Sequence, residues 1–182
     1  MGTELSDKLV LVTGGTHGIG QAAVRICLEE GAKVVFCARN VEEIRREQES
    51  RASEFGKDRV MGLAADVADE DAIGTLFSKA GDHFGATPDR VIHSAGIYGP
   101  IGNILDVPLD SWIEAIRINL YGSVVVTRVA ARHMKDLGGG RIALLSGGGA
   151  ASPFPNYSAY ACSKSAVVRL VETLAIELSP FN

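Results

Sequence analysis

The chain has 182 residues, of which 46% are hydrophobic, and this size and composition predict a single globular domain over residues 1–182. Its formal net charge of -4 and its lack of Lys/Arg runs give no basic surface for a polyanion, so we expect no nucleic-acid partner. Its three cysteines form no C-x-x-C pair, so we expect neither a disulfide framework nor a metal site. The sequence has neither a signal peptide nor an apolar run of roughly 18 residues, so we expect no membrane partner and a cytoplasmic location.

Short apolar runs alternate with longer segments of helical periodicity along the chain. Strands are predicted at 8–13, 33–38, 59–65, 90–95 and 141–146, because each run is brief, aliphatic or β-branched, and bounded by Gly, Asp or Asn. Helices are predicted near 18–30, 41–55, 69–84, 109–136 and 157–179. This alternation predicts an α/β fold with a doubly wound sheet, in which right-handed crossovers join parallel strands.

A glycine-rich turn, TGGTHGIG, joins the first predicted strand to the first predicted helix at residues 13–20. Gly14, Gly18 and Gly20 leave room for a pyrophosphate to approach backbone N–H groups at the positive end of that helix. The spacing is one residue longer than the G-x-G-x-x-G dinucleotide fingerprint, and a purely structural turn is the alternative. The position between strand and helix favours a dinucleotide site.

A second candidate lies in the stretch YSAYACSK, residues 157–164. Tyr160 and Lys164 are four residues apart and share one helix face, whereas Tyr157 has Ala161 at the equivalent position. An ammonium group beside a phenol favours the phenolate, so we expect Lys164 to lower the pKa of Tyr160. The alternative is an ordinary helix with an exposed lysine and a half-buried tyrosine.

Six motifs in chain order resemble the short-chain dehydrogenase/reductase family. They are T-G-x-x-x-G-I-G at 13–20, Asp66-Val67, Ala95-Gly96, Asn119, Ser146 and Tyr160-x-x-x-Lys164. The resemblance covers nearly the whole chain. It implies a Rossmann-type sheet with strand order 3-2-1-4-5 and NAD(P)-dependent interconversion of a carbonyl and an alcohol in a small-molecule substrate.

The resemblance also implies a role for each site residue. Tyr160 would be the general acid or base, and Lys164 would lower its pKa and bind the nicotinamide ribose. Ser146 would donate to the substrate oxygen, Asn119 would hold a water linked to Lys164, and Asp66 would accept from the adenine amino group. The cofactor-binding residues implied are Thr13, Gly14, Thr16, His17, Gly18, Ile19, Gly20, Arg39, Asp66, Val67, Ala95, Gly96, Tyr160 and Lys164.

The sequence departs from the family pattern in three places. The run His93-Ser94-Ala95-Gly96 replaces Asn-Asn-Ala-Gly, and we expect a structural role for His93. Ser146 precedes Tyr160 by 14 positions, one more than usual, so either the loop holds an extra residue or Gly147 occupies the place of the serine. The chain ends at ELSPFN, where family members usually continue, so we expect a C-terminally incomplete domain whose substrate the sequence does not identify.

The end of the second strand bears on cofactor choice. An acidic residue there would accept hydrogen bonds from the ribose hydroxyls of NAD, whereas an arginine accommodates the 2′-phosphate of NADP. Here Ala38 is followed by Arg39, whose charged planar fork suits a phosphate. We therefore expect NADP, with NAD as the alternative, because Arg39 is also consistent with an ordinary surface residue and Glu42 or Glu43 would oppose a phosphate.

Two broader expectations concern assembly and activity. The helices near 109–136 and 157–179 carry more apolar residues than docking on their own sheet requires, so we expect a homodimer or homotetramer formed through them. Sequence beyond Asn182 that covers this surface is the alternative. For the function, the alternative to an oxidoreductase is a non-catalytic nucleotide-binding regulatory or scaffold protein of the same fold.

Overall fold

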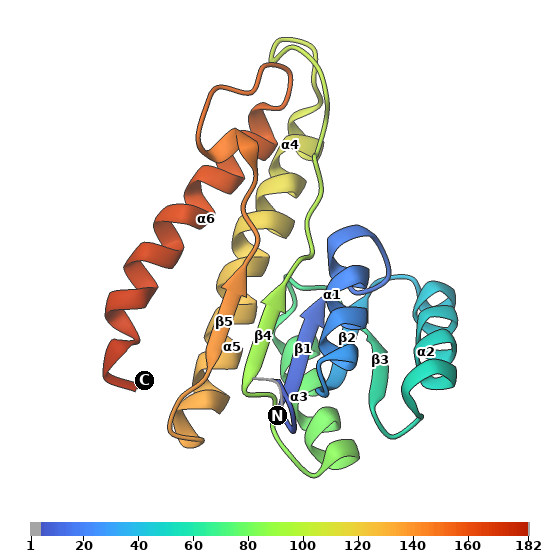
Figure 1. The fold of residues 1–182 in the computed structure, drawn as a ribbon. Coiled ribbons are helices and arrows are strands. Elements are labelled where there is room, and N and C mark those ends of the chain that lie inside the picture. The colour runs from blue at the N-terminus through green and yellow to red at the C-terminus, as the bar shows by residue number, and fades with distance from the viewer. Residues whose placement is uncertain (1–4, 182) are drawn as a thin grey trace.

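A computed structural model describes residues 5–181 and contains one parallel sheet of five strands. The strands are β1 (Leu9–Thr13), β2 (Lys33–Ala38), β3 (Val60–Ala64), β4 (Arg90–His93) and β5 (Arg141–Leu144). Their order is β3-β2-β1-β4-β5, which confirms the predicted sheet (Figure 1). In the register of the sheet, Thr13 at the end of β1 lies between Cys37 of β2 and His93 of β4, so three strands end at one edge.

The helices begin and end within two residues of their predicted limits, with one exception. They are α1 (Gly18–Glu29), α2 (Val41–Phe55), α3 (Glu70–Phe84), α4 (Leu109–Ile116), α5 (Gly122–Asp136) and α6 (Ser158–Glu177), with short 3₁₀ turns η2 (Gly148–Ala150) and η3 (Ser179–Phe181). The prediction of one α-helix over 109–136 is wrong, because a π-helical turn, η1 (Arg117–Tyr121), separates α4 from α5. The hydroxyl of Ser123 donates to the Asn119 carbonyl oxygen at 2.6 Å and so satisfies an acceptor in this widened turn.

Two hydrophobic cores cover the two faces of the sheet. Leu9 and Leu11 of β1 belong to the core formed with α3 and α5, whereas Val10 and Val12 belong to the core formed with α1 and α2. Every residue of β1 is buried, as expected for a central parallel strand with helices on both faces. The alternation of side chains along the strand therefore fixes its register and the position of the turn that follows it.

The sequence at the start of α2 positions Arg39 at the end of β2. Asn40 is the N-cap of α2, and its side-chain oxygen accepts the backbone N–H groups of Glu42 and Glu43 at 3.0 and 3.3 Å. Such a cap satisfies donors that the first helical turn leaves without acceptors. The chain thus turns sharply between β2 and α2, and Arg39 lies at the C-terminal edge of the sheet.

The last helix, α6, lies at the side of the molecule next to the edge strand β5 (Figure 1). Its first half packs on α4, η1 and η2, and it buries Ser163, Lys164 and Val167. Its second half leaves Val168, Val171 and Ile176 exposed. In the part of the chain that the structure describes, no helix combines the length and apolar character needed to cross a membrane.

Candidate active site

A cleft of about 680 Å³ opens at the C-terminal ends of the strands, where an open α/β sheet ordinarily binds its ligand. Residues from the turn after β1, the ends of β2 and β3, the loops after β4 and β5, and the first half of α6 meet in it. Among the predicted site residues, the cleft is lined by Gly14, Thr16, His17, Gly18, Ile19, Arg39, Asp66, Val67, Ala95, Gly96, Ser146, Tyr160 and Lys164. Thr13, Gly20 and Asn119 do not line the cleft, but each contacts a residue that does: Ala95, Gly14 and Ile97, respectively.

The glycine-rich turn requires glycine at two positions for reasons of space. Gly14 has φ +68°, and a Cβ there would lie 2.9 Å from the backbone nitrogen of Ala95. A Cβ at Gly20 would overlap the carbonyl oxygen of Gly14. Gly18 has φ +53° and faces open space. The turn therefore keeps its backbone close-packed at the N-terminus of α1, which fits a diphosphate because the first-turn N–H groups lack intrahelical acceptors.

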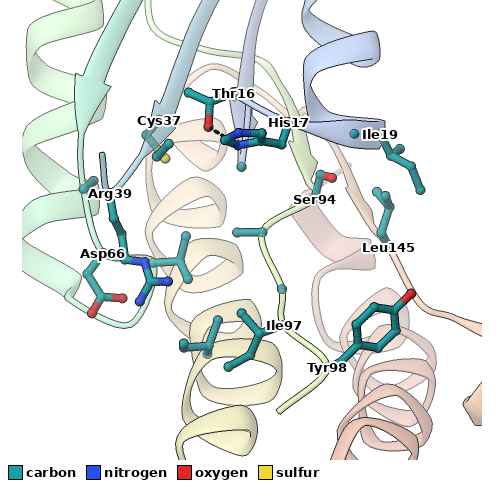
Figure 2. A pocket seen from close by; sticks show the side chains of 18 of the residues that line it. Thr16, His17, Ile19, Cys37, Arg39, Asp66, Ser94, Ile97, Tyr98 and Leu145 are labelled. Carbon is teal, nitrogen blue, oxygen red and sulfur yellow. Dashed lines mark hydrogen bonds between the residues drawn. The ribbon is translucent and has the colours of Figure 1, made fainter. Parts of the chain in front are cut away.

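Two arginines surround Asp66 at the opposite end of the cleft from α6. One Asp66 oxygen accepts the Ala68 N–H at 3.0 Å, and the other accepts from the Arg117 guanidinium at 2.8 Å. Arg39 points toward the same carboxylate in Figure 2. Partial burial raises the pKa of Asp66, but the hydrogen bonds from Ala68 and Arg117 and the charges of Arg117 and Arg39 outweigh it and lower that pKa below its usual range. Asp66 is thus a carboxylate that already has partners.

Besides Asp66, the side of the cleft near Arg39 includes the acidic residue Glu43. The Oε2 atom of Glu43 lies 3.6 Å from Nδ1 of His17, and both residues line the cleft. His17 Nδ1 also lies 3.0 Å from the Thr16 hydroxyl oxygen, as the dashed line in Figure 2 marks. Glu42 instead pairs with Arg45 on the outer side of α2. Of the two carboxylates expected to oppose a phosphate, only Glu43 therefore reaches the cleft.

Tyr160 and Lys164 lie one turn apart on α6 and both line the cleft. The Lys164 ammonium is buried and donates to the Leu145 carbonyl oxygen at 2.8 Å, while it lies 5.9 Å from the Tyr160 ring centre. Burial lowers the pKa of Lys164. Burial, with a smaller contribution from Tyr98, raises the pKa of Tyr160. The expected lowering by Lys164 is therefore wrong for this conformation, because the ammonium turns toward Leu145.

The loop after β5 brings Gly147, rather than Ser146, against the Tyr160 hydroxyl. The Ser146 hydroxyl donates to the backbone carbonyl oxygen of Lys164 at 3.1 Å. A Cβ at Gly147 would overlap the hydroxyl oxygen of Tyr160. This geometry favours the alternative in which Gly147 occupies the place of the family serine, although Ser146 also lines the cleft.

Asn119 holds the loop after β4 against α6. Its side-chain oxygen accepts the Ile97 N–H at 2.8 Å, and its side-chain nitrogen donates to the Ile97 carbonyl at 2.8 Å and to the Ser163 hydroxyl at 2.9 Å. Gly96 fits between this amide and Lys164, since a Cβ at Gly96 would lie 3.1 Å from Asn119 Oδ1 and 3.4 Å from Lys164 Nζ. The side chain of Asn119 thus fixes the segment that borders the cleft, and its expected link to Lys164 through a water stays a prediction.

His93 is the last residue of β4, and its side chain is buried beneath the cleft. Its Nδ1 is 2.7 Å from the Thr13 hydroxyl, which also accepts the Ala95 N–H at 3.2 Å. Its Nε2 has no hydrogen-bond partner among residues 5–181. Burial, assisted by the charge of Lys164, lowers the pKa of His93 to about 3, so the ring is neutral near neutrality.

Sequence reasoning missed several residues in and around the cleft, and Tyr98 and Arg117 are two of them. Tyr98 lines the cleft, and its position two residues after Ala95-Gly96 was a usable signal. Arg117 pairs with Asp66 across 51 positions of sequence, and no local motif marks that pairing. In the described range 5–181, no group of three or more His, Cys, Asp or Glu side chains lies together as a metal site.

Known proteins are similar in sequence to this chain over nearly its whole length. A dehydrogenase/reductase SDR family member 4 from Sus scrofa is 33% identical over 178 residues, which are 98% of this chain and 63% of that protein. Versicolorin reductase stcU of Emericella nidulans is 37% identical over 175 residues, covering 95% of this chain and 64% of the relative. The chain therefore spans about two thirds of the length of these relatives.

Solved structures and a family model agree with these relatives. The structure of an NAD⁺-bound xylitol dehydrogenase superposes with a TM-score of 0.92 at 29% identity and covers 99% of this chain and 68% of that one. The family model described as short chain dehydrogenase matches residues 8–182. The chain belongs to the short-chain dehydrogenase/reductase family.

Proposed function

We propose that this chain is the cofactor-binding and catalytic part of an NADP-dependent oxidoreductase that interconverts a carbonyl and an alcohol. The observation that carries the proposal is that the glycine cradle after β1, Arg39 after β2, and Tyr160 with Lys164 on α6 all open into one cleft. Such convergence of an anion cradle and a proton donor suits a nicotinamide enzyme. Relatives with printed activities include L-rhamnose 1-dehydrogenase (NAD(P)⁺) of Azotobacter vinelandii, 35% identical over 182 residues.

In this proposal the bound cofactor supplies or accepts the hydride, and the protein supplies binding and the proton. Backbone N–H groups at the start of α1 bind the diphosphate, and the Lys164 ammonium lies at the base of the cleft. The Tyr160 hydroxyl is the proton donor to the substrate oxygen. Its raised pKa keeps this phenol protonated near neutrality, which is the form that carbonyl reduction requires.

The preference for NADP rests on the charges at the end of β2. Ala38 presents no carboxylate to a ribose hydroxyl, and Arg39 lines the cleft at that point. Glu43, 3.6 Å from His17, lies on the same side of the cleft. A guanidinium that binds the 2′-phosphate directly makes a charge-assisted contact, which we expect to exceed the repulsion from Glu43.

The test is whether the protein oxidises NADPH in the presence of a panel of ketones and aldehydes. We expect NADPH oxidation that depends on the carbonyl compound and is slower with NADH. If NADPH binds in calorimetry but no carbonyl compound of the panel is reduced, the non-catalytic nucleotide-binding alternative replaces the oxidoreductase. If neither cofactor binds, both functions fail.

A further inference from the structure

Four aromatic side chains gather around the Tyr160 end of the cleft, and we call Tyr98, Phe154, Tyr157 and Tyr160 the aromatic cluster. The ring centres of Tyr98 and Tyr160 lie 5.0 Å apart, and those of Tyr98 and Tyr157 lie 5.6 Å apart. Phe154 stacks on Tyr157 at 4.6 Å and lies 6.2 Å from Tyr160. Tyr98 comes from the loop after β4, and the other three rings come from the stretch that joins η2 to the start of α6, so two segments distant in sequence contribute them.

Close packing holds both loops of the aromatic cluster in place. Gly99, next to Tyr98, has φ +71°, and a Cβ there would lie 2.6 Å from the Ala115 side chain. A Cβ at Gly149 would lie 3.0 Å from the Ala161 Cα and 3.4 Å from the Phe154 Cβ. The hydrogen bonds of Asn119 to Ile97 fix the residue before Tyr98. The aromatic cluster is therefore a preformed surface.

Two rings of the aromatic cluster have faces available to a ligand. Tyr98 is 58% exposed and Phe154 is 40% exposed, although both contact rings that are largely covered. Tyr98 and Tyr160 both line the cleft. Figure 2 shows Tyr98 near Leu145, at the opposite end of the cleft from Arg39 and Asp66. An exposed aromatic surface thus lies directly beside the proposed proton donor.

Within residues 5–181, this end of the cleft offers few polar side chains other than the tyrosine hydroxyls to a hydroxylated or charged substrate. Gly147, which faces the Tyr160 hydroxyl, has no side chain. The Ser146 hydroxyl donates to a backbone carbonyl, and so does the Lys164 ammonium. Sugars and carboxylates need several convergent polar groups, whereas a flat apolar ligand needs ring faces and one hydrogen-bond donor.

We propose that the aromatic cluster selects aryl ketones and aryl alcohols, with the substrate oxygen at the Tyr160 hydroxyl and the substrate ring against Tyr98 and Phe154. This inference rests on the proposed function, because it names the substrate class of the same site. Contacts between aromatic rings add to the effect of buried area, so an aryl ketone should bind about two- to tenfold more tightly than a saturated ketone of the same size.

Acetophenone and cyclohexyl methyl ketone form a matched pair of probes for the aromatic cluster. The dissociation constant of each is measured by NMR titration of the protein with NADP⁺ present, because the oxidised cofactor has no hydride to give to a ketone. We expect acetophenone to bind about two- to tenfold more tightly. In Phe154→Leu and Tyr98→Leu the ratio should fall to about one, whereas Tyr98→Phe should keep it. Tyr121→Leu, an exposed tyrosine outside the cleft, is the control.

Equal affinities of the two ketones for the unaltered protein, or no measurable binding of either, would overturn the aryl preference without any variant. A preference that persists in a folded Phe154→Leu and a folded Tyr98→Leu would also overturn it. The proposed function fails separately, when NADPH is not oxidised by any carbonyl compound. An aryl preference without turnover therefore supports the binding surface and rejects the enzyme.

Discussion

We propose that the cofactor preference of the cleft depends on Arg39. It follows the last residue of β2, and the Asn40 cap fixes the turn in which it lies. Its charge helps to lower the pKa of Asp66, which indicates that the guanidinium is electrostatically close to that carboxylate. A phosphate that binds Arg39 would therefore also change the environment of Asp66.

Replacing Arg39 tests this preference. A charge-assisted contact to a phosphate is worth about 1.5 to 3 kcal/mol, so Arg39→Ala should weaken NADPH binding about ten- to a hundredfold and leave NADH binding nearly unchanged. Calorimetric titration with both cofactors measures the two affinities. Arg46→Ala, an exposed arginine of α2 outside the cleft, is the matched control. Equal affinity of the unaltered protein for NADPH and NADH contradicts the preference.

His93 determines part of the pH dependence of folding. Its pKa falls from 6.5 to about 3 on folding, mainly because the ring is buried. Between these values the unfolded chain binds a proton that the folded chain does not, so stability is lost as the pH falls below the unfolded pKa. For this group alone, the free energy of unfolding should drop by about 2 kcal/mol between about pH 7 and about pH 5.

Substitution by a residue that does not titrate isolates this contribution. His93→Asn keeps a polar partner for the Thr13 hydroxyl and removes the titrating ring. Urea unfolding at both pH values should therefore show a smaller loss of stability in His93→Asn than in the unaltered protein. The same loss in both proteins would show that His93 does not account for the pH dependence.

The turn between β1 and α1 links the packing of these two elements to the geometry of the cleft. Gly20 of α1 touches the carbonyl of Gly14, and Gly14 in turn lies against the backbone of Ala95 after β4. Three backbone segments thus meet with no side chain between them. We therefore expect the proposed diphosphate site to depend on the close packing of Gly14 with Gly20 and Ala95.

Gly20→Ala should destabilise the protein by about 1 to 3 kcal/mol, because the added methyl would overlap the Gly14 carbonyl and the backbone would have to shift to make room. It should also weaken NADPH binding. The control is Gly74→Ala, within α3, where an added Cβ meets nothing within 4 Å and alanine should stabilise the helix by about 1 kcal/mol. Thermal unfolding measures both changes. Equal effects of the two substitutions would contradict the role of the turn.

Local sequence patterns predicted the elements well and the contacts between them less well. The strands and the shorter helices follow from apolar periodicity and from caps such as Asn40, which act within a few residues. The π-helical turn could not be predicted, because it accompanies contacts of Asn119 with Ile97 and Ser163, 22 and 44 residues away. The direction of the Lys164 ammonium depends similarly on the Leu145 carbonyl, which only the folded loop brings near. The sequence does not decide whether Ser146 or Gly147 faces the Tyr160 hydroxyl, because that position also depends on the folded loop after β5.

At the scale of the whole molecule, a groove of about 640 Å³ lies between α5, β5 and the second half of α6. The sequence predicts surplus apolar residues on the helix near 109–136, but Val125, Val126 and Val129 of α5 are buried in the core against α3. The apolar lining of the groove comes instead from Val124, Ala131, Ile142, Leu144, Leu170, Val171, Leu174, Ala175, Leu178 and Phe181. We propose that a second copy of the chain pairs with α5 and α6 over this surface.

Val171→Glu tests the pairing, because Val171 of α6 is exposed and lines this groove. We expect light scattering at micromolar concentration to give a dimer or tetramer for the unaltered protein and a monomer for Val171→Glu, since a buried unpaired carboxylate is costly. Ile26→Glu, which places the same charge on the exposed side of α1, should not change the mass. A monomeric unaltered protein would remove the proposal.

We propose that Tyr160 gives the proton while the cofactor gives the hydride. The rate of carbonyl-dependent NADPH oxidation in two tyrosine variants tests this division of roles. Tyr160→Phe removes the hydroxyl and keeps the ring, so turnover should fall by at least about a hundredfold with NADPH affinity nearly unchanged. Tyr157→Phe, three residues earlier on the same stretch, should keep most of the activity. An active Tyr160→Phe together with an inactive Tyr157→Phe would contradict the account.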